Sequence, residues 1–238
     1  MELTDLSDLL RLMKEAWPKL YSHSAGVANL TLRICNYLRL NEVEQEILIT
    51  GAFLHDVGKM FIKREIIDKP GLLTEEEWAE LKEHTGRGAS LIAERGGDSS
   101  LVEIVRYHHE RWDGKGYEGL REQQIPWRAR VIALADALNA MISLRPYRLP
   151  LKMDEALEEV YQGAGSQFDP QLVAALAKES FWQIATYRDP ARLKRQIDEE
   201  KQWLAQLADS YVTLSYLLVY AQSQWLDHLL VMLRQLKG

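Results

Sequence analysis

Six histidines are spread along the 238-residue chain, and the neighbours of three of them indicate chemistry rather than packing. His55 is followed directly by Asp56, and His108 and His109 are adjacent after the apolar segment LVEIVRY. A further carboxylate, Asp136, lies within the aliphatic run VIALADALNA, where a bare charge is costly unless it is paired or bound to a cation. A lone histidine is more often structural than a ligand, so the clustering of these groups is what predicts a site.

Neutral imidazoles together with carboxylates suit a first-row transition metal such as Fe, Mn or Zn better than Ca or Mg. Five histidines and two aspartates are more ligands than one ion requires. They suit two ions about 3.5–4 Å apart that share a bridging carboxylate, and such metal pairs cleave phosphoesters. The candidate ligands are His23, His55, Asp56, His84, His108, His109 and Asp136.

The elements that would position these ligands are helical. Apolar residues recur at helical spacing in segments 6–17, 27–38, 101–109 and 125–142, and segment 44–60 is more apolar and expected to be more buried. After the break at Pro70-Gly71, Thr74 and Glu77 have the spacing of a capping box, which predicts a helix start. Residues 110–126 form a glycine-rich loop. Since no convincing run of alternating strand residues occurs, the predicted fold class is all-α.

Composition limits the partners and the location. The formal charge of −6, from 29 basic and 35 acidic side chains, argues against a nucleic-acid polymer as partner but leaves room for a small anion. The single cysteine, Cys35, cannot form an internal disulfide, which favours a reducing cytoplasm. The N-terminus lacks the apolar core of a signal peptide, and no stretch approaches the roughly 20 apolar residues of a membrane span. We therefore expect a cytoplasmic protein.

A domain boundary is expected near Asp189-Pro190. Beyond it, apolar residues recur at helical spacing on both sides of a polar break at Asp209-Ser210. This pattern predicts an antiparallel helical hairpin that must pack on something. The expected domains are residues 1–188, which contain every candidate ligand, and a hairpin over residues 189–238.

The order of the candidate ligands, with Lys59 shortly after His55, resembles the HD-GYP family of the HD superfamily of metal-dependent phosphohydrolases. The resemblance continues through HSAGVA, HDVGK, KPGLLTEEEW, YHHERWDGKGY and RPYR, and it covers roughly residues 15–185. It implies an HD-type helical bundle with a metal centre that hydrolyses cyclic di-GMP to pGpG or GMP.

The resemblance also implies roles for individual residues. One ion would be surrounded by His23, His55, Asp56 and Asp136. Asp56 would bridge to a second ion held by His84, His108 and His109.

The resemblance places the substrate beside four further residues. Lys59 would lie next to the scissile phosphate and offset charge on the leaving oxygen, while Tyr117 would lie against the ligand. Arg145 and Arg148 are candidates to bind phosphate, since a guanidinium matches phosphate oxygens; otherwise they belong to a solvated basic turn.

The sequence departs from the family pattern at three places. The Gly-Tyr-Pro motif reads Gly116-Tyr117-Glu118, which adds negative charge near the ligand and counts against the contacts with diguanylate-cyclase domains linked to that motif. Asn139 replaces a common aspartate and is not an expected ligand. Lys19 replaces a glutamate that binds a third metal in some members, so we predict two ions. We expect these ions to be Fe or Mn rather than Zn.

The C-terminal segment LSYLLVYAQSQWLDHLL is similar to small two-helix aspartyl-phosphate phosphatases that act on a sporulation response regulator. If so, Gln224 and Asp227 would reach the phosphorylated site of that partner, and His228 would be a structural or surface residue. The alternative is a hairpin that packs on the catalytic domain or forms a homodimer.

Two alternative functions remain open. The chain could be a weakly active cyclic di-GMP sensor whose hairpin binds or dephosphorylates a response regulator. It could also be an HD phosphohydrolase that acts on another nucleotide.

Overall fold

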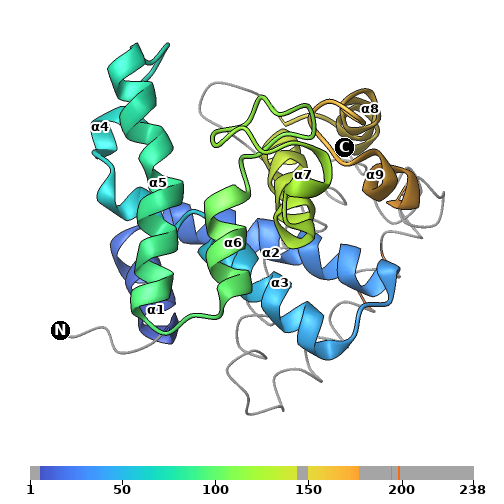
Figure 1. Cartoon of the computed structure of the whole chain (residues 1–238), viewed down its shortest axis with the longest axis horizontal. Helices are drawn as coiled ribbons and strands as arrows, with labels where there is room; N and C mark the ends of the chain where they lie inside the picture. The colour runs from blue at the N-terminus through green and yellow to red at the C-terminus, as the bar shows by residue number, and fades with distance from the viewer. Residues whose placement is uncertain (1–5, 144–149, 177–193, 195–197, 199–238) are drawn as a thin grey trace.

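The computed structural model describes residues 6–143 and 150–176, together with positions 194 and 198 (Figure 1). Within this part of the chain every regular element is a helix, and the only strand-like feature is an isolated bridge between Ala164 and Phe168. The predicted all-α class is therefore confirmed. The predicted hairpin over residues 189–238 lies outside the described residues, apart from those two positions.

Two helices form the N-terminal part, and they contain the predicted helical segments 6–17 and 27–38 apart from position 17, which lies between them. Helix α1 spans Leu6–Ala16 and helix α2 spans Pro18–Leu38. Pro18 occupies the first position of α2, where its missing N–H costs nothing and its fixed φ favours a helical start. Helix α2 ends at Leu38, and the next residue, Arg39, has a left-handed φ of 55° that stops the helix.

Helix α3 spans Glu42–Leu54 and is capped by Asn41, whose side chain accepts a hydrogen bond from the Glu44 N–H at 2.9 Å. The expected single helical segment 44–60 is wrong at its C-terminal end. The α-helix stops at Leu54, and a short 3-10 helix, η1, covers Val57–Phe61. The close approach of η1 to α5 explains the break, because a Cβ at Gly58 would lie 1.9 Å from the carbonyl oxygen of His84.

The remaining helices follow with short connections. Helix α4 spans Arg64–Ile67, α5 spans Glu75–Glu94, α6 spans Ser99–Tyr107, and a 3-10 turn, η2, covers Glu122–Gln124. Helix α7 spans Trp127–Ile142, α8 spans Met153–Gln162 and α9 spans Pro170–Leu176. The predicted capping box at the start of α5 is confirmed, since Thr74 and Glu77 exchange hydrogen bonds of 3.2 and 2.8 Å.

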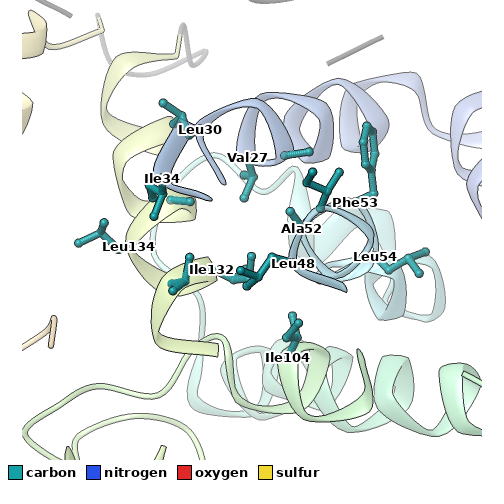
Figure 2. Close-up of a cluster of buried hydrophobic side chains, with 14 of the residues drawn as sticks. Val27, Leu30, Ile34, Leu48, Ala52, Phe53, Leu54, Ile104, Ile132 and Leu134 are labelled. Atoms are coloured by element: carbon teal, nitrogen blue, oxygen red, sulfur yellow. The ribbon is translucent and has the colours of Figure 1, made fainter. Parts of the chain in front are cut away.

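The core lies where α2, α3, α6 and α7 meet, and Figure 2 shows their apolar side chains converging. Leu48, Ala52 and Phe53 of α3 are completely buried there, between Val27 of α2 and Ile104 of α6. Because α3 is enclosed on several sides, the two residues that follow it are held on a rigid support. Within the described part of the chain, no helix is both long and apolar enough to cross a membrane.

Candidate metal centre

Three helices and the ends of two others bring the candidate ligands together. Helix α2 carries His23, α5 carries His84 and α7 carries Asp136. His55 and Asp56 follow the last residue of α3, and His108 and His109 follow the last residue of α6.

Asp56 lies at the middle of the group. Its Oδ1 is 3.3 Å from Nε2 of His84 and 3.6 Å from Nε2 of His108. Its Oδ2 is 3.4 Å from Nε2 of His55 and 3.7 Å from Nε2 of His23. The two oxygens of one carboxylate thus face two different pairs of imidazoles.

Three of the histidines have their ring orientation fixed by the backbone. Nδ1 of His55 lies 2.7 Å from the carbonyl oxygen of residue 52, Nδ1 of His84 lies 2.6 Å from that of residue 81, and Nδ1 of His108 lies 2.9 Å from that of residue 105. A carbonyl only accepts, so each Nδ1 carries the proton and each Nε2 keeps its lone pair. This tautomer suits metal binding through Nε2.

The same lone pairs are buried without a partner among the described residues. Nε2 of His55, His84 and His108 and Oδ1 of Asp56 have no hydrogen bond and almost no solvent contact. Leaving a buried acceptor unsatisfied costs about 1–3 kcal/mol, and four of them face the same region. A cation would satisfy all four at once, so the arrangement fits a metal site.

The ligand atoms divide into two groups that share Asp56. One group joins Asp56 to His84, His108 and His109, and the other joins it to His23 and His55; within each group every ligand atom is within 4.8 Å of the others. Asp136 adjoins the second group, with Oδ1 3.1 Å from Nε2 of His23 and 3.9 Å from Nε2 of His55. The cluster could therefore hold metal, with Asp56 between the two groups.

The protonation states also suit cation binding. Burial lowers the pKa of His108 to about 4, and burial with the charge of His108 lowers the pKa of His109 well below its usual value, so both are neutral at pH 7. Burial raises the pKa of Asp56, but the ammonium group of Lys59 and the neighbouring imidazole of His55 outweigh this and hold it well below its usual range. The pKa of Asp136 is likewise lowered because His23 outweighs the effect of burial.

Lys59 stands at the edge of the cluster. Its Nζ lies 2.5 Å from Oδ2 of Asp56, and its side chain is 22% exposed. Lys59 belongs to the 3-10 helix η1 and not to a continuous α-helix over the expected segment 44–60. The 3-10 turn places the ammonium group against Asp56, whose own side chain is only 1% exposed.

Tyr117 forms one wall of the site. Its ring centroid is 4.7 Å from that of His109 and 6.2 Å from that of His84. The ammonium group of Lys82 lies 5.4 Å from the centroid of the same ring. Burial raises the pKa of Tyr117 to about 12, so the phenol stays protonated. Sequence reasoning missed Lys82, although it is only two residues before His84.

Glu110 fixes the loop that carries Tyr117. It is 4% exposed, and its two carboxylate oxygens accept hydrogen bonds of 2.6 Å from the N–H groups of Glu118 and Leu120. The side chain of Glu118 pairs with Nε of Arg106 at 3.2 Å. The negative charge of Glu118 is thus paired with a cation on α6. Glu110 was also missed, although it directly follows the histidine pair.

The remaining predicted residues belong to neither ligand group or lie outside the described part of the chain. Lys19 pairs with Asp68 at 3.1 Å rather than with the ligands. Asn139 lies beside His23, with its Nδ2 3.0 Å from Nδ1 of the ring. The other predicted residues, all outside the described residues, are Arg145, Arg148, Gln224, Asp227 and His228.

Comparison with known proteins gives a family match over most of the chain. The model of the HD domain family matches residues 6–172. The chain is 38% identical over 162 residues to a cyclic di-GMP phosphodiesterase of Thermotoga maritima, covering 66% of this chain and 44% of the relative. It is 43% identical over 152 residues to a cyclic di-GMP phosphodiesterase of Vibrio cholerae, covering 60% and 31%.

A third relative has another nucleotide in its name. The 3'3'-cGAMP-specific phosphodiesterase 3 of Vibrio cholerae is 33% identical over 162 residues, covering 68% of this chain and 35% of that protein. The chain therefore matches less than half the length of each of these three relatives.

Solved structures share the fold. The HDG"Y"P protein Bd1817 of Bdellovibrio bacteriovorus superimposes with a TM-score of 0.54 at 21% identity, covering 72% of this chain and 55% of that one. The HD domain of the L. monocytogenes phosphodiesterase PgpH, in complex with cyclic di-AMP, gives 0.53 at 18%, covering 74% and 94%. The predicted HD-type helical bundle is thus confirmed.

Proposed function

Because the chain belongs to the HD domain family, we propose that it is a phosphodiesterase that hydrolyses cyclic di-GMP at a centre of two divalent transition-metal ions. The observation that carries the proposal is the pair of ligand groups that meet at Asp56. Relatives named cyclic di-GMP phosphodiesterases, at 38% and 43% identity, support the substrate.

The proposed ions are Fe or Mn, with Zn as a further candidate, because imidazole and carboxylate ligands accept all three. Two such ions would lower the pKa of a water molecule to about 7, which supplies hydroxide for attack on phosphorus at neutral pH. Asp56 would bridge the two ligand groups. Lys19 pairs with Asp68. A lysine cannot supply the carboxylate that a third metal would need, which supports a centre of two ions.

The residues around the cluster would hold the substrate. Lys59, with its ammonium group at the solvent edge, would offset the charge that develops on the leaving oxygen. Tyr117 and Lys82 form a wall of aromatic and cationic character beside His84 and His109. Such a wall suits an anionic ligand with flat bases. Arg145 and Arg148 remain candidates for the second phosphate.

The second candidate substrate is 3'3'-cGAMP, which the name of one relative at 33% identity favours. The two nucleotides differ in one base and share the phosphodiester ring. The metal centre and Lys59 would therefore act in the same way on either, and discrimination would come from groups beside the bases.

The test is hydrolysis by anaerobically purified protein loaded with Mn(II) or Fe(II). We expect pGpG or GMP from cyclic di-GMP, with bound metal approaching two ions per chain by elemental analysis. Asp56→Asn should abolish both, whereas the matched surface control Glu94→Gln should not. Faster cleavage of 3'3'-cGAMP would favour the second substrate. Tight cyclic di-GMP binding by metal-loaded protein without any product would contradict the proposal and indicate a sensor.

A further inference from the structure

We infer that Asn139 is a positioning residue that decides which ring nitrogen of His23 carries the proton, and thereby whether His23 can be a metal ligand. The inference rests on the proposed two-metal centre, because it concerns one of its ligands. It assigns a task to a side chain that lies next to the centre without belonging to either ligand group.

His23, whose side chain is 23% exposed, differs from the three buried histidines in the partner of its Nδ1. Nδ1 of His55, His84 and His108 each faces a backbone carbonyl three residues earlier, which accepts a proton and nothing else. Nδ1 of His23 instead faces the side-chain amide of Asn139, at 3.0 Å. An amide offers a donor on one side and an acceptor on the other, so the backbone does not fix this tautomer.

In the orientation of the structure, the amide group of Asn139 donates to Nδ1 of His23. The ring proton is then on Nε2, which lies 3.1 Å from Oδ1 of Asp136 and can donate to it. In that tautomer Nε2 has no lone pair for an ion. A half-turn of the amide would present Oδ1 to Nδ1, place the proton there and free the lone pair of Nε2.

The surroundings of Asn139 permit either orientation. Ser143 Oγ lies 3.3 Å from Oδ1 of Asn139, and a hydroxyl group can donate to an oxygen or accept from an NH2 group. The amide itself is confined. Asn139 is 6% exposed, and a Cβ at Gly26 of α2 would lie 2.4 Å from its Oδ1 and 3.0 Å from its Cγ.

The first experiment changes the hydrogen-bonding capacity at position 139. Asn139→Asp presents only acceptors when ionised, so it should favour the ligand tautomer and tighten metal binding. Asn139→Leu has similar volume and no polar atom, and it should weaken binding of the ion next to His23 by roughly 10–100-fold. Asn36→Asp and Asn36→Leu, on the exposed face of α2, are the matched controls.

The readouts are independent of enzymatic activity. Zn(II) and Mn(II) affinities are measured by competition with a chelating dye, and stoichiometry by elemental analysis. Nitrogen-15 NMR of the Zn(II)-loaded wild-type protein should show His23 protonated at Nδ1. In Asn139→Leu that signal should weaken, while the signals of His55, His84 and His108 should stay the same.

A second variant acts on the amide from a distance. Gly26→Ala should displace Asn139 and weaken binding as Asn139→Ala does, although alanine favours the helix more than glycine does. In the double variant with both Gly26→Ala and Asn139→Ala, the two losses of metal affinity should not add. The amide that the added methyl group at position 26 would displace is already absent there. Thermal unfolding without metal identifies any variant that binds poorly because it is unfolded.

Two outcomes would overturn the inference alone. One is unchanged metal affinity in both Asn139→Leu and Asn139→Asp. The other is that the affinity losses of Gly26→Ala and Asn139→Ala add fully in the double variant. In either case wild-type protein would still bind two ions and the proposed function would stand. If the wild-type protein bound no ion, the proposed function would fail first and this inference with it.

Discussion

At the scale of single residues, Asp56 is the side chain on which the site depends. Its two oxygens face different pairs of imidazoles at 3.3–3.7 Å, and Lys59 holds it ionised. A carboxamide at this position keeps the volume but loses one acceptor and the charge. The residue therefore tests both ligand groups at once.

We expect Asp56→Asn to reduce metal affinity by more than about 100-fold, since even residues that only orient a ligand contribute 10–100-fold. Dye competition and elemental analysis measure this directly, with Glu94→Gln as the surface control. Retention of two tightly bound ions would contradict the assignment of Asp56 as the shared ligand.

Lys59 should separate metal binding from catalysis. In Lys59→Met the counter-charge to Asp56 is lost, so divalent ions should bind at least as tightly as in the wild type. Turnover should fall on the order of 10²-fold because one cation near the developing charge is missing. Parallel measurement of kcat and metal affinity, with exposed Lys63→Met as control, decides the point. Loss of metal in Lys59→Met would show a structural role instead.

At the scale of elements, the loop between α6 and α7 depends on Glu110. This carboxylate accepts from two backbone N–H groups that flank the turn after Tyr117. The ion pair between Arg106 and Glu118 adds little by itself, because both side chains are more than a third exposed and solvent screens such pairs. The buried acceptor is therefore the main restraint on the loop.

Glu110→Ala should release this loop. We expect faster hydrogen exchange at the amides of Glu118 and Leu120, a loss of about 1–3 kcal/mol in stability, and a rise in KM as Tyr117 loses its fixed position. Glu103→Ala, on the exposed face of α6, is the control. Unchanged exchange at both amides would show that the loop is held by other contacts.

The elements also show where sequence reasoning succeeds and where it stops. Helical periodicity and the capping box at Thr74 are local signals, and they predicted the start of α5 and the all-α class. The end of α3 depends on the contact between Gly58 and α5. That contact joins segments far apart in the sequence, so a local pattern does not reveal it. The pairing of Asn139 with His23 spans 116 positions. No local pattern indicates such a pairing.

At the scale of the whole molecule, the ligands lie on three helices and just past the ends of two others, so bound ions would tie most of the bundle together. An ion that binds only the folded state stabilises it by about 2.7 kcal/mol when the free ion is at 100 times its Kd. Cys35 offers a way to measure this, since burial raises the pKa of its thiol to about 12. At pH 8 the thiol is protonated and inaccessible.

Alkylation of Cys35 should therefore follow unfolding. At pH 8 and 100 times Kd of free Mn(II), labelling should slow about 100-fold relative to chelator-treated protein, because fewer molecules are unfolded at any moment. Labelling is measured by intact mass over time. Asp56→Asn should show no such slowing. If Mn(II) left the labelling rate of the wild-type protein unchanged, metal binding would not be coupled to global stability.

The position of the ligands just after the last residues of α3 and α6 has one further consequence. Each residue advances a helix by about 100° of rotation and 1.5 Å of rise, so the length of these helices sets the direction in which His55 and His108 point. A single residue inserted into α6 would swing its histidines more than a quarter of a circle away from Asp56. Over evolutionary time, α3 and α6 should therefore keep a constant number of residues while their sequences drift.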